Sequence, residues 1–419
     1  MRNYSSFLDQ HRDLTRRYFL RLGAGSAVAL ACWPRSVRGA DVAPELAEAI
    51  EKLETILTAQ NKFQDVSRGE PLPHSLPAEK KTEVGLTRDT WQLEVLADPE
   101  KPARLRKPMT KADNTALDFA GILKLAEKHS VRFAKVMTCL NIGCPLGAGI
   151  WEGVPLREIL WLTEPRENLR RVFYYGYHND DPKQMFKSSL PVGRVPEDPF
   201  DLPPVIVCYK LNGEWLSSER GGPVRIVVPE AYGFKSIKWL SHIYLSNIAA
   251  ANDTYGEQNN DVDSPLKTFA ATLSVPRKVK AGAAIPVTGY AQVGIGGLSK
   301  VQVWLESKAD PHPASDRKYT TAPWKDADIL PPPKSWGGDL PDKKIPAGTL
   351  GFDDATGQPR TWPLRLFKVH WATLLPGLPA GEFTLRSRAI DEKGNAQPMP
   401  RPFKKSGWAD IERVPIVVE

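Results

Sequence analysis

The sequence predicts an α+β domain followed by an all-β sandwich. A length of 419 residues suggests two domains rather than one. Up to about residue 263, helical and alternating stretches mix without the regular order of a parallel βαβ sheet. Beyond Asp261, short alternating stretches are separated by Pro- and Gly-rich turns, and no helical pattern intervenes. We therefore place the α+β domain at residues 41–263 and the sandwich at 264–419.

An export signal is predicted at the N-terminus, residues 1–40. Adjacent arginines in Thr15-Arg16-Arg17-Tyr18-Phe19-Leu20 precede an apolar run at 23–33, and this order indicates a signal of twin-arginine type. The apolar run is too short to span a bilayer, which needs about 20 residues, and no later segment is long and apolar enough either. An ordinary amphipathic helix is the alternative. We expect a periplasmic protein without a stable membrane span after processing.

The two domains differ in the elements that their patterns predict. In the first, helices are expected at 42–60, 115–129 and 155–162, and strands at 90–95, 133–138, 173–178, 205–209, 224–228 and 239–245. In the second, strands are expected at 268–275, 284–291, 300–306, 381–390 and 413–418. The stretch 309–358 is rich in Pro, Asp and Lys. It is predicted as a long surface insertion, ordered only by packing against the body.

Charge and cysteine content exclude several classes of protein. The net charge of +7 comes mostly from residues 1–40, and the remaining 49 basic and 47 acidic residues leave +2, which gives no electrostatic case for nucleic acid. Beyond the signal there are three cysteines, so no disulfide framework is possible and at least one thiol is free. There is no Cys-x-x-Cys-His motif for a covalent haem, and no two histidines have metal-ligand spacing on a helix.

Cys139 is the first candidate for chemistry. It ends the strand predicted at 133–138 and enters a Gly- and Pro-rich loop that contains Cys144. A thiolate at such a position can act as a soft metal ligand. The alternatives are a small buried apolar residue or a disulfide between Cys139 and Cys144, and spacing alone favours these alternatives.

The segment after Cys139 favours the interpretation of Cys139 as a metal ligand over these alternatives. The sequence W-E-G-V-P-L-R-E-I-L at 151–160 follows Cys139 by about a dozen residues, and together they resemble the sulfite oxidase family of molybdenum enzymes. Further blocks follow in the family's order: Y-K-L-N-G-E-W-L at 209–216, G-P-V-R-I-V-V-P at 222–229, G-F-K-S-I-K-W-L at 233–240, and three short blocks at 287–291, 388–391 and 394–398. The resemblance covers most of the chain from about residue 60. It implies a molybdopterin domain followed by an immunoglobulin-like dimerisation domain.

The resemblance also implies a cofactor and its site. Cys139 would supply the protein thiolate to molybdenum, which a single molybdopterin would also hold. Tyr255 would lie on the substrate side, where a phenol can donate a hydrogen bond. The implied cofactor contacts, in which arginine suits the phosphate, are Arg68, His74, Asp181, Arg220, Arg225, Ser236 and Lys238. The less specific interpretation of each charged residue is a solvated strand end or turn.

The resemblance predicts an oxidoreductase that transfers an oxygen atom, with sulfite or a related small sulfur compound as the substrate class. The loop after Cys139 lacks the arginine that sulfite-oxidising members carry there, and this departure weighs against sulfite. The alternatives are a reductase of S- or N-oxides, a non-catalytic exported scaffold of the same fold, and a copper or disulfide-exchange protein using Cys139 and Cys144. We expect a homodimer and a separate electron carrier, such as a c-type cytochrome or a membrane quinone-linked protein.

Overall fold

The computed structural model describes residues 42–140, 144–254, 262–263, 265–398 and 410–419. Contacts divide the chain into two units, residues 1–48 and 49–419, and all the sheets lie in the second. The predicted signal at 1–40 and the predicted substrate-side residue Tyr255 lie outside the described residues. Within the described ranges, no helix is long and apolar enough to cross a bilayer.

The first helix is shorter than the pattern predicts. Helix α2 covers Pro44–Glu51 instead of 42–60. Beyond it the backbone pairs with distant segments, since the amide of Leu57 donates to the carbonyl of Trp336 at 2.9 Å and that of Thr58 to Ala148 at 2.8 Å. These amides would bond within the segment if the helix continued. Tertiary pairing therefore overrides helical periodicity.

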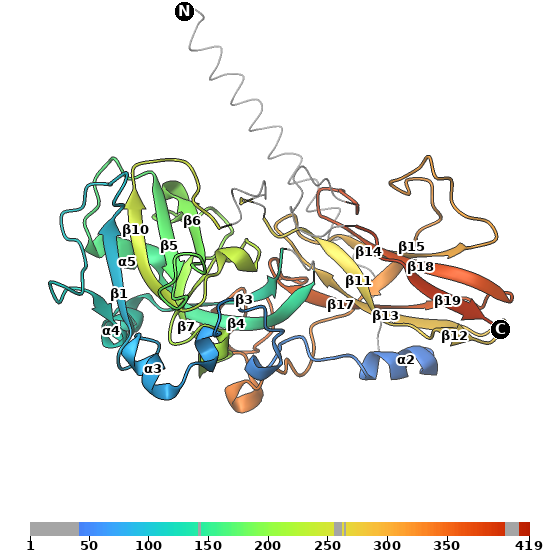
Figure 1. Cartoon of the computed structure of the whole chain (residues 1–419). Coiled ribbons are helices and arrows are strands. Elements are labelled where there is room, and N and C mark those ends of the chain that lie inside the picture. The colour runs from blue at the N-terminus through green and yellow to red at the C-terminus, as the bar shows by residue number, and fades with distance from the viewer. Residues whose placement is uncertain (1–41, 141–143, 255–261, 264, 399–409) are drawn as a thin grey trace, which may run out of the picture. The chain divides into compact units, whose positions relative to one another are not determined.

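The first sheet has the strand order β2-β1-β10-β5-β6 (Figure 1). Its strands are β1 (Gln92–Ala97), β2 (Leu117–Asp118), β5 (Arg171–Gly176), β6 (Lys187–Pro191) and β10 (Leu240–Ser246). Only the pairing of β1 with β10 is parallel among these neighbours. Strands β1, β5 and β10 confirm three predicted strands, whereas β6 is not predicted from the sequence.

A core of apolar side chains lies between this sheet and the next. It joins Val95 of β1 and Ile243 of β10 to Val207 of the second sheet. Two helices pack into the same core, α4 (Phe119–His129) and α5 (Leu156–Leu162), as predicted at 115–129 and 155–162. The carboxylate of Asp118 caps α4 by accepting a hydrogen bond from the amide of Gly121 at 2.7 Å.

The second sheet carries the strand that ends at Cys139. Its order is β16-β3-β4-β7-β8, and β9 also pairs with β7. The strands are β3 (Val131–Thr138), β4 (Pro145–Pro155), β7 (Ile206–Leu211), β8 (Glu214–Trp215), β9 (Arg225–Val227) and β16 (Thr349–Leu350). The loops of the first domain also contain short helices. They are η1 (Gln60–Lys62), η2 (Pro73–Ser75), α3 (Ala78–Glu83), η3 (Val192–Arg194), η4 (Ser218–Arg220) and, after β9, η5 (Gly233–Lys235).

Strand β4 is the main omission from the sequence prediction. Its glycines suggest a loop, but each marks a close approach in the sheet. A Cβ at Gly147 would lie 2.5 Å from the ring of Phe63, and one at Gly153 would lie 2.3 Å from the carbonyl oxygen of Val207. Side chains are therefore excluded from these positions because neighbouring atoms occupy the space.

The C-terminal region is a sheet of eight strands, ordered β11-β13-β17-β15-β14-β18-β19-β12. The strands are β11 (Phe269–Ser274), β12 (Lys278–Val279), β13 (Ile285–Gln292), β14 (Lys300–Ser307), β15 (Lys325–Ile329), β17 (Lys368–Leu375), β18 (Gly381–Ile390) and β19 (Val414–Val418). Val287 of β13 and Trp371 of β17 share one core with Val303 of β14 and Leu385 of β18. The two halves therefore pack face to face and β15 joins them, which confirms the predicted sandwich-like all-β region.

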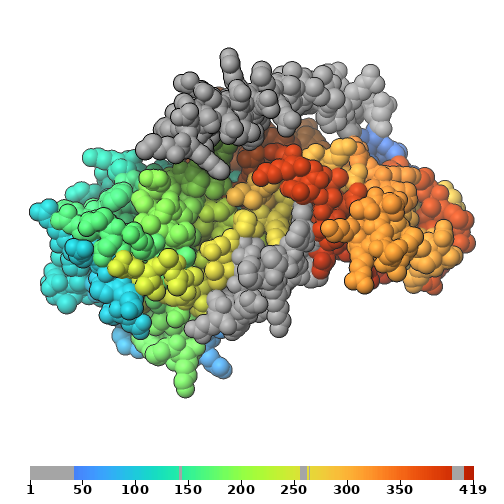
Figure 2. Space-filling view, turned by 90° about the horizontal axis from the view of Figure 1, so that it is seen from above, coloured from blue at the N-terminus to red at the C-terminus, as the bar shows by residue number. Residues whose placement is uncertain are grey.

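The expectation for residues 309–358 is wrong in part. The segment contains β15, which pairs with both β14 and β17, and η7 (Pro341–Lys343). It also contains β16, which pairs with β3 of the first domain. Trp336 and Phe352 are buried in a core with Val136 and Ile150. Much of the segment is nevertheless exposed, and orange atoms gather at one end of the molecule in Figure 2. Buried apolar residues thus attach residues 309–358 to the rest of the chain, although their composition is typical of a loop.

Candidate functional site

A cavity of about 400 Å³ opens in the first domain, where segments far apart in the sequence meet. One wall comes from the chain before the first sheet, one from the end of β3, and the others from η4, β9 and the segment through η5 to Trp239. The residues that line it include Phe63, Ser67, Arg68, Cys139, Trp151, His178, Arg220, Arg225, Ser236, Lys238 and Trp239. Six of the predicted site residues are therefore brought together around one space.

Cys139 reaches this cavity because β3 ends there. Thr138, the last residue of β3, is buried and its hydroxyl donates to the side-chain carbonyl of Gln292 in β13, which fixes the strand end against the second domain. Cys139, Cys144 and Cys208 are all free thiols in the described chain. The disulfide alternative for Cys139 and Cys144 does not form. Burial, followed by the neighbouring Cys139, raises the pKa of the Cys144 thiol.

Arg220 is held at the inner end of the cavity by a capped turn. The hydroxyl of Ser217 accepts a hydrogen bond from the amide of Arg220 at 3.3 Å, and Gly221 takes a left-handed conformation with φ of 98°. The Arg220 side chain is 3% exposed, and its Nη1 donates to the carbonyl of Phe63 at 3.2 Å. Its Nε is buried without a hydrogen-bond partner among the described residues. A buried guanidinium with a spare donor can bind an anion.

Arg225 opens strand β9 beside Arg220. Its Nη1 donates to the carbonyl of Arg220 at 2.8 Å and its Nη2 to the carbonyl of Ser236. The guanidinium lies 5.2 Å from the ring centre of Trp151. Burial lowers the pKa of Arg225 to about 10. Its Nε, like that of Arg220, is a buried donor without a partner in the described part of the chain.

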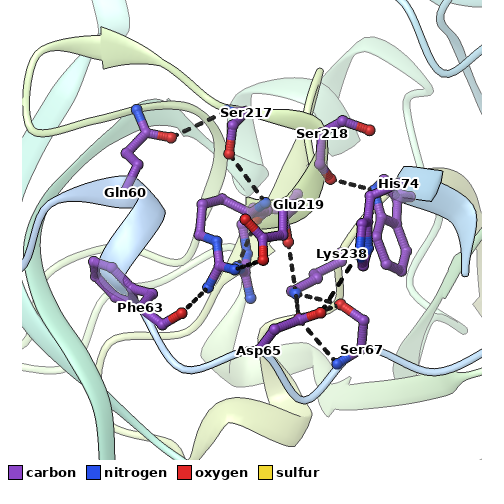
Figure 3. A network of polar contacts seen from close by, with 12 residues as sticks. Gln60, Phe63, Asp65, Ser67, His74, Ser217, Ser218, Glu219 and Lys238 are labelled. Atoms are coloured by element: carbon purple, nitrogen blue, oxygen red, sulfur yellow. Dashed lines mark hydrogen bonds and ion pairs between the residues drawn. The ribbon is translucent and has the colours of Figure 1, made fainter. Parts of the chain in front are cut away.

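Lys238 completes the cationic group, and Figure 3 shows its contacts. Its Nζ donates to the carboxylate of Asp65 at 2.9 Å, to the hydroxyl of Ser67 at 2.6 Å and to the carbonyl of Glu219 at 2.7 Å. Burial and the positive charge of Arg225 lower the pKa of Lys238 to about 8 against the opposing effect of Asp65. Burial alone would raise the pKa of Asp65, but hydrogen bonds from Ser67 and Lys238 outweigh it and bring that pKa to about 2.

The remaining predicted residues have different surroundings. The hydroxyl of Ser236 lines the cavity and accepts a hydrogen bond from the amide of Val228 at 3.1 Å. Arg68 also lines it, and its guanidinium lies 5.4 Å from the ring centre of Phe186. His74 does not reach the cavity: it stacks on Trp239 at 6.1 Å with its Nε2 3.7 Å from Asp65.

Asp181 also lies away from the cavity wall. Its carboxylate accepts hydrogen bonds from the amide of Lys183 at 2.8 Å and the side-chain amide of Gln184 at 3.0 Å, which is a local turn. His178, three residues before Asp181, lines the cavity instead.

His178, Asp65 and Ser67 are the residues that sequence reasoning missed. His178 is buried, and its Nδ1 lies 3.1 Å from the carbonyl of Gly176. Burial, and then the charge of Arg68, lower the pKa of His178. Its position three residues before the predicted contact Asp181 was the available signal. For Asp65 and Ser67, the Asp-x-Ser spacing typical of a turn was the only signal.

The residues fit molybdopterin, the group that the resemblance implies. Buried Nε donors of Arg220 and Arg225 and the ammonium of Lys238 suit its phosphate. The aromatic walls formed by Phe63, Trp151 and Trp239 suit a flat heterocycle. Cys139 presents a thiol to the same space, as a soft metal ligand requires.

Comparisons with known proteins point to the same cofactor. Residues 83–253 match the family described as the oxidoreductase molybdopterin binding domain. Sulfite oxidase of Gallus gallus is 29% identical over 276 residues, which are 59% of this chain and 56% of that protein. The protein-methionine-sulfoxide reductase catalytic subunit MsrP of Ralstonia nicotianae is 34% identical over 131 residues, 27% of this chain and 39% of that protein. The chain thus spans 56% or less of either relative.

A solved structure supports the fold over nearly the whole length. The sulfane dehydrogenase SoxCD from Paracoccus pantotrophus superposes with a TM-score of 0.54 at 17% sequence identity, covering 92% of this chain and 95% of that chain. At this identity the likeness concerns the fold, an α+β domain followed by an all-β region. Residues 83–253 therefore belong to the family of oxidoreductase molybdopterin binding domains, and the chain is similar in sequence to sulfite oxidases.

Proposed function

We propose that the chain is an exported molybdopterin-dependent oxidoreductase that transfers an oxygen atom at a molybdenum ligated by Cys139. Sulfite or a related small sulfur compound is the proposed substrate class. The observation that carries the proposal is the meeting of a free thiol with buried, incompletely paired arginines in one cavity. The thiol would serve the metal and the arginines the phosphate of one cofactor, and a purely structural core has no use for either group.

The chain's own residues would hold, orient and shield the bound group. When bound, the molybdenum cofactor supplies two-electron redox chemistry and exchange of an oxygen atom with the substrate. Arg220, Arg225 and Lys238 hold its anionic end, and the aromatic walls exclude water. Because a carbonyl can only accept, the Nδ1 of His178 carries the proton in its contact with Gly176, which leaves Nε2 to accept one. Its lowered pKa favours this neutral form.

A second candidate function is the reduction of S- or N-oxides at the same site. The cavity lining near Cys139 includes the apolar side chains of Met137, Leu140, Leu146 and Phe234, and no arginine occurs between residues 139 and 147. An apolar wall suits a thioether or sulfoxide better than a dianion. The relative from Ralstonia nicotianae is named as a reductase of methionine sulfoxide in proteins.

Export, electron transfer and assembly complete the proposal. The twin-arginine pattern at 15–20 supports export to the periplasm. No Cys-x-x-Cys-His motif occurs in the 419 residues, so electrons would pass through a separate carrier, such as a c-type cytochrome or a membrane quinone-linked protein. The all-β region at 264–419 would form a homodimer, and light scattering at micromolar concentration tests this, with a monomer contradicting it.

The test is molybdenum analysis of natively exported protein and of two cysteine variants. We expect about one molybdenum per chain in the wild type and in Cys144→Ser, and loss of the metal in Cys139→Ser. Cys144 is the matched control because it is also a half-buried free thiol. A stable metal-free wild type after native export would instead support a non-catalytic scaffold of the same fold. Bound copper or a titratable thiol pair would support a copper or disulfide-exchange protein that uses Cys139 and Cys144. Stopped-flow mixing with sulfite and with methionine sulfoxide then distinguishes oxidation from reduction.

A further inference from the structure

Two carboxylates contact the cations at one end of the cavity, although neither is among the residues that line it. Asp65 contacts Lys238, and the carboxylate of Glu219 lies 2.8 Å from Nη2 of Arg220. An incoming anion would meet negative charge as well as three cations. These two carboxylates have no part in the proposed chemistry, and Figure 3 shows them beside Lys238.

Counting donors shows that Lys238 cannot bind an external anion as it stands. A lysine ammonium has three hydrogens to donate. All three are used, on Asp65, Ser67 and the carbonyl of Glu219, at distances between 2.6 and 2.9 Å. A direct contact with a ligand therefore requires that one of these three acceptors leaves.

Of the three acceptors, Asp65 is the one that a ligand anion would displace. The carbonyl of Glu219 belongs to the turn that Ser217 caps and is fixed by it. Ser67 is neutral and can remain beside an anion as a donor. Asp65 carries a full negative charge, and like charges at hydrogen-bond distance in a buried site repel strongly. We infer that Asp65 is a built-in counter-ion of Lys238 that is exchanged for an anionic group of the ligand when the cavity is loaded.

This inference rests on the proposed function only in placing an anionic ligand group at Arg220, Arg225 and Lys238. Asp65 lies in the segment between Phe63 and Arg68, which forms one wall of the cavity. When Asp65 leaves Lys238, this segment loses its ion pair to the segment that follows η5. Asp65 thus neutralises the charge of Lys238 and competes with an anionic ligand group for it.

The test measures binding of inorganic phosphate to the full chain prepared without cofactor, from a host that cannot make molybdopterin. Isothermal titration would compare the wild type with Asp65→Asn, which keeps the size of the side chain and removes its charge. We expect phosphate to bind at least tenfold more tightly to D65N than to the wild type. Lys238→Met should weaken phosphate binding at least tenfold, because it removes the cation itself.

Asp353→Asn is the matched control. Like Asp65, Asp353 accepts from the amide and hydroxyl of a residue in its own turn, here Thr356 at 2.9 Å each. In the described structure it forms its turn in the C-terminal region, away from the residues that line the cavity. D353N should bind phosphate as the wild type does. Asp65→Ser serves as a second neutral variant if D65N folds poorly, and thermal melting checks both.

The outcomes separate the two proposals. Phosphate affinity in D65N equal to or below that of the wild type, with K238M weakened, would overturn the counter-ion inference and leave the anion site intact. Equal phosphate binding by K238M, Arg225→Met and the wild type would instead overturn the placement of the cofactor. Tighter binding in D65N and D65S but not in D353N supports exchange of Asp65.

Discussion

The buried ion pair between Lys235 and Asp253 offers the sharpest test of how the site is held. The two side chains are 2% and 1% exposed, and their N–O distance is 2.8 Å. Lys235 also donates to the carbonyl of Ser189 at 2.7 Å, and Asp253 accepts from the hydroxyls of Ser188 and Ser189. The pair thus joins η5, next to the cavity, to β6.

Asp253→Asn leaves the lysine buried without its counter-ion. Breaking a buried pair from one side costs about 3–5 kcal/mol. Three hydrogen bonds converge on the carboxylate of Asp253, from Lys235, Ser188 and Ser189, so the upper part of that range is expected. The double variant Lys235→Met with Asp253→Leu removes both charges, and its free energy of unfolding should lie within about 2 kcal/mol of the wild type.

The pH dependence gives an independent check. Burial lowers the pKa of Lys235 even with Asp253 present, and D253N should lower it further. A lysine whose folded pKa lies below its unfolded value of 10.5 costs stability at low pH, and stability rises as pH increases toward that value. The loss of unfolding free energy in D253N should therefore shrink as the pH rises toward 10.5, whereas the double variant should show no such recovery.

Urea unfolding followed by tryptophan fluorescence measures the single and the double variant against the wild type. The reasoning is refuted if D253N lies within about 1 kcal/mol of the wild type, or if the double variant is as unstable as the single one. If the loss of unfolding free energy in D253N grows with pH, a buried charged lysine is not its cause.

Two further predictions concern single positions. Gly153→Ala should lower the free energy of unfolding by about 1–3 kcal/mol, because its Cβ would lie 2.3 Å from the carbonyl oxygen of Val207. Urea unfolding would show the change, and an unchanged midpoint would contradict the packing of β4 on β7. Cys208 should resist alkylation at pH 8 in the folded chain, since burial raises its pKa to about 12. Mass spectrometry after iodoacetamide treatment would detect modification, and labelling of Cys208 before unfolding would refute its burial.

Much of the site was predictable because its residues lie in blocks with recognisable order. Cys139 at a strand end and Arg225, Ser236 and Lys238 in two adjacent blocks all line the cavity. His74 and Asp181 were predicted with them but do not line it. Local spacing could not distinguish a residue that reaches the cavity from a neighbour that forms a turn beside it.

By itself, the sequence determined the division into an α+β domain and an all-β region, since hydrophobic periodicity is a local property. It also predicted a thiol and several cations that line the cavity. Only the tertiary structure decided that the glycines of β4 form a strand, because Phe63 and Val207 from distant segments occupy the space above them. The same holds for residues 309–358, whose strands exist through pairing with β3, β14 and β17. Asp65 became part of the site for the same reason, since its partner Lys238 is 173 residues away in the chain.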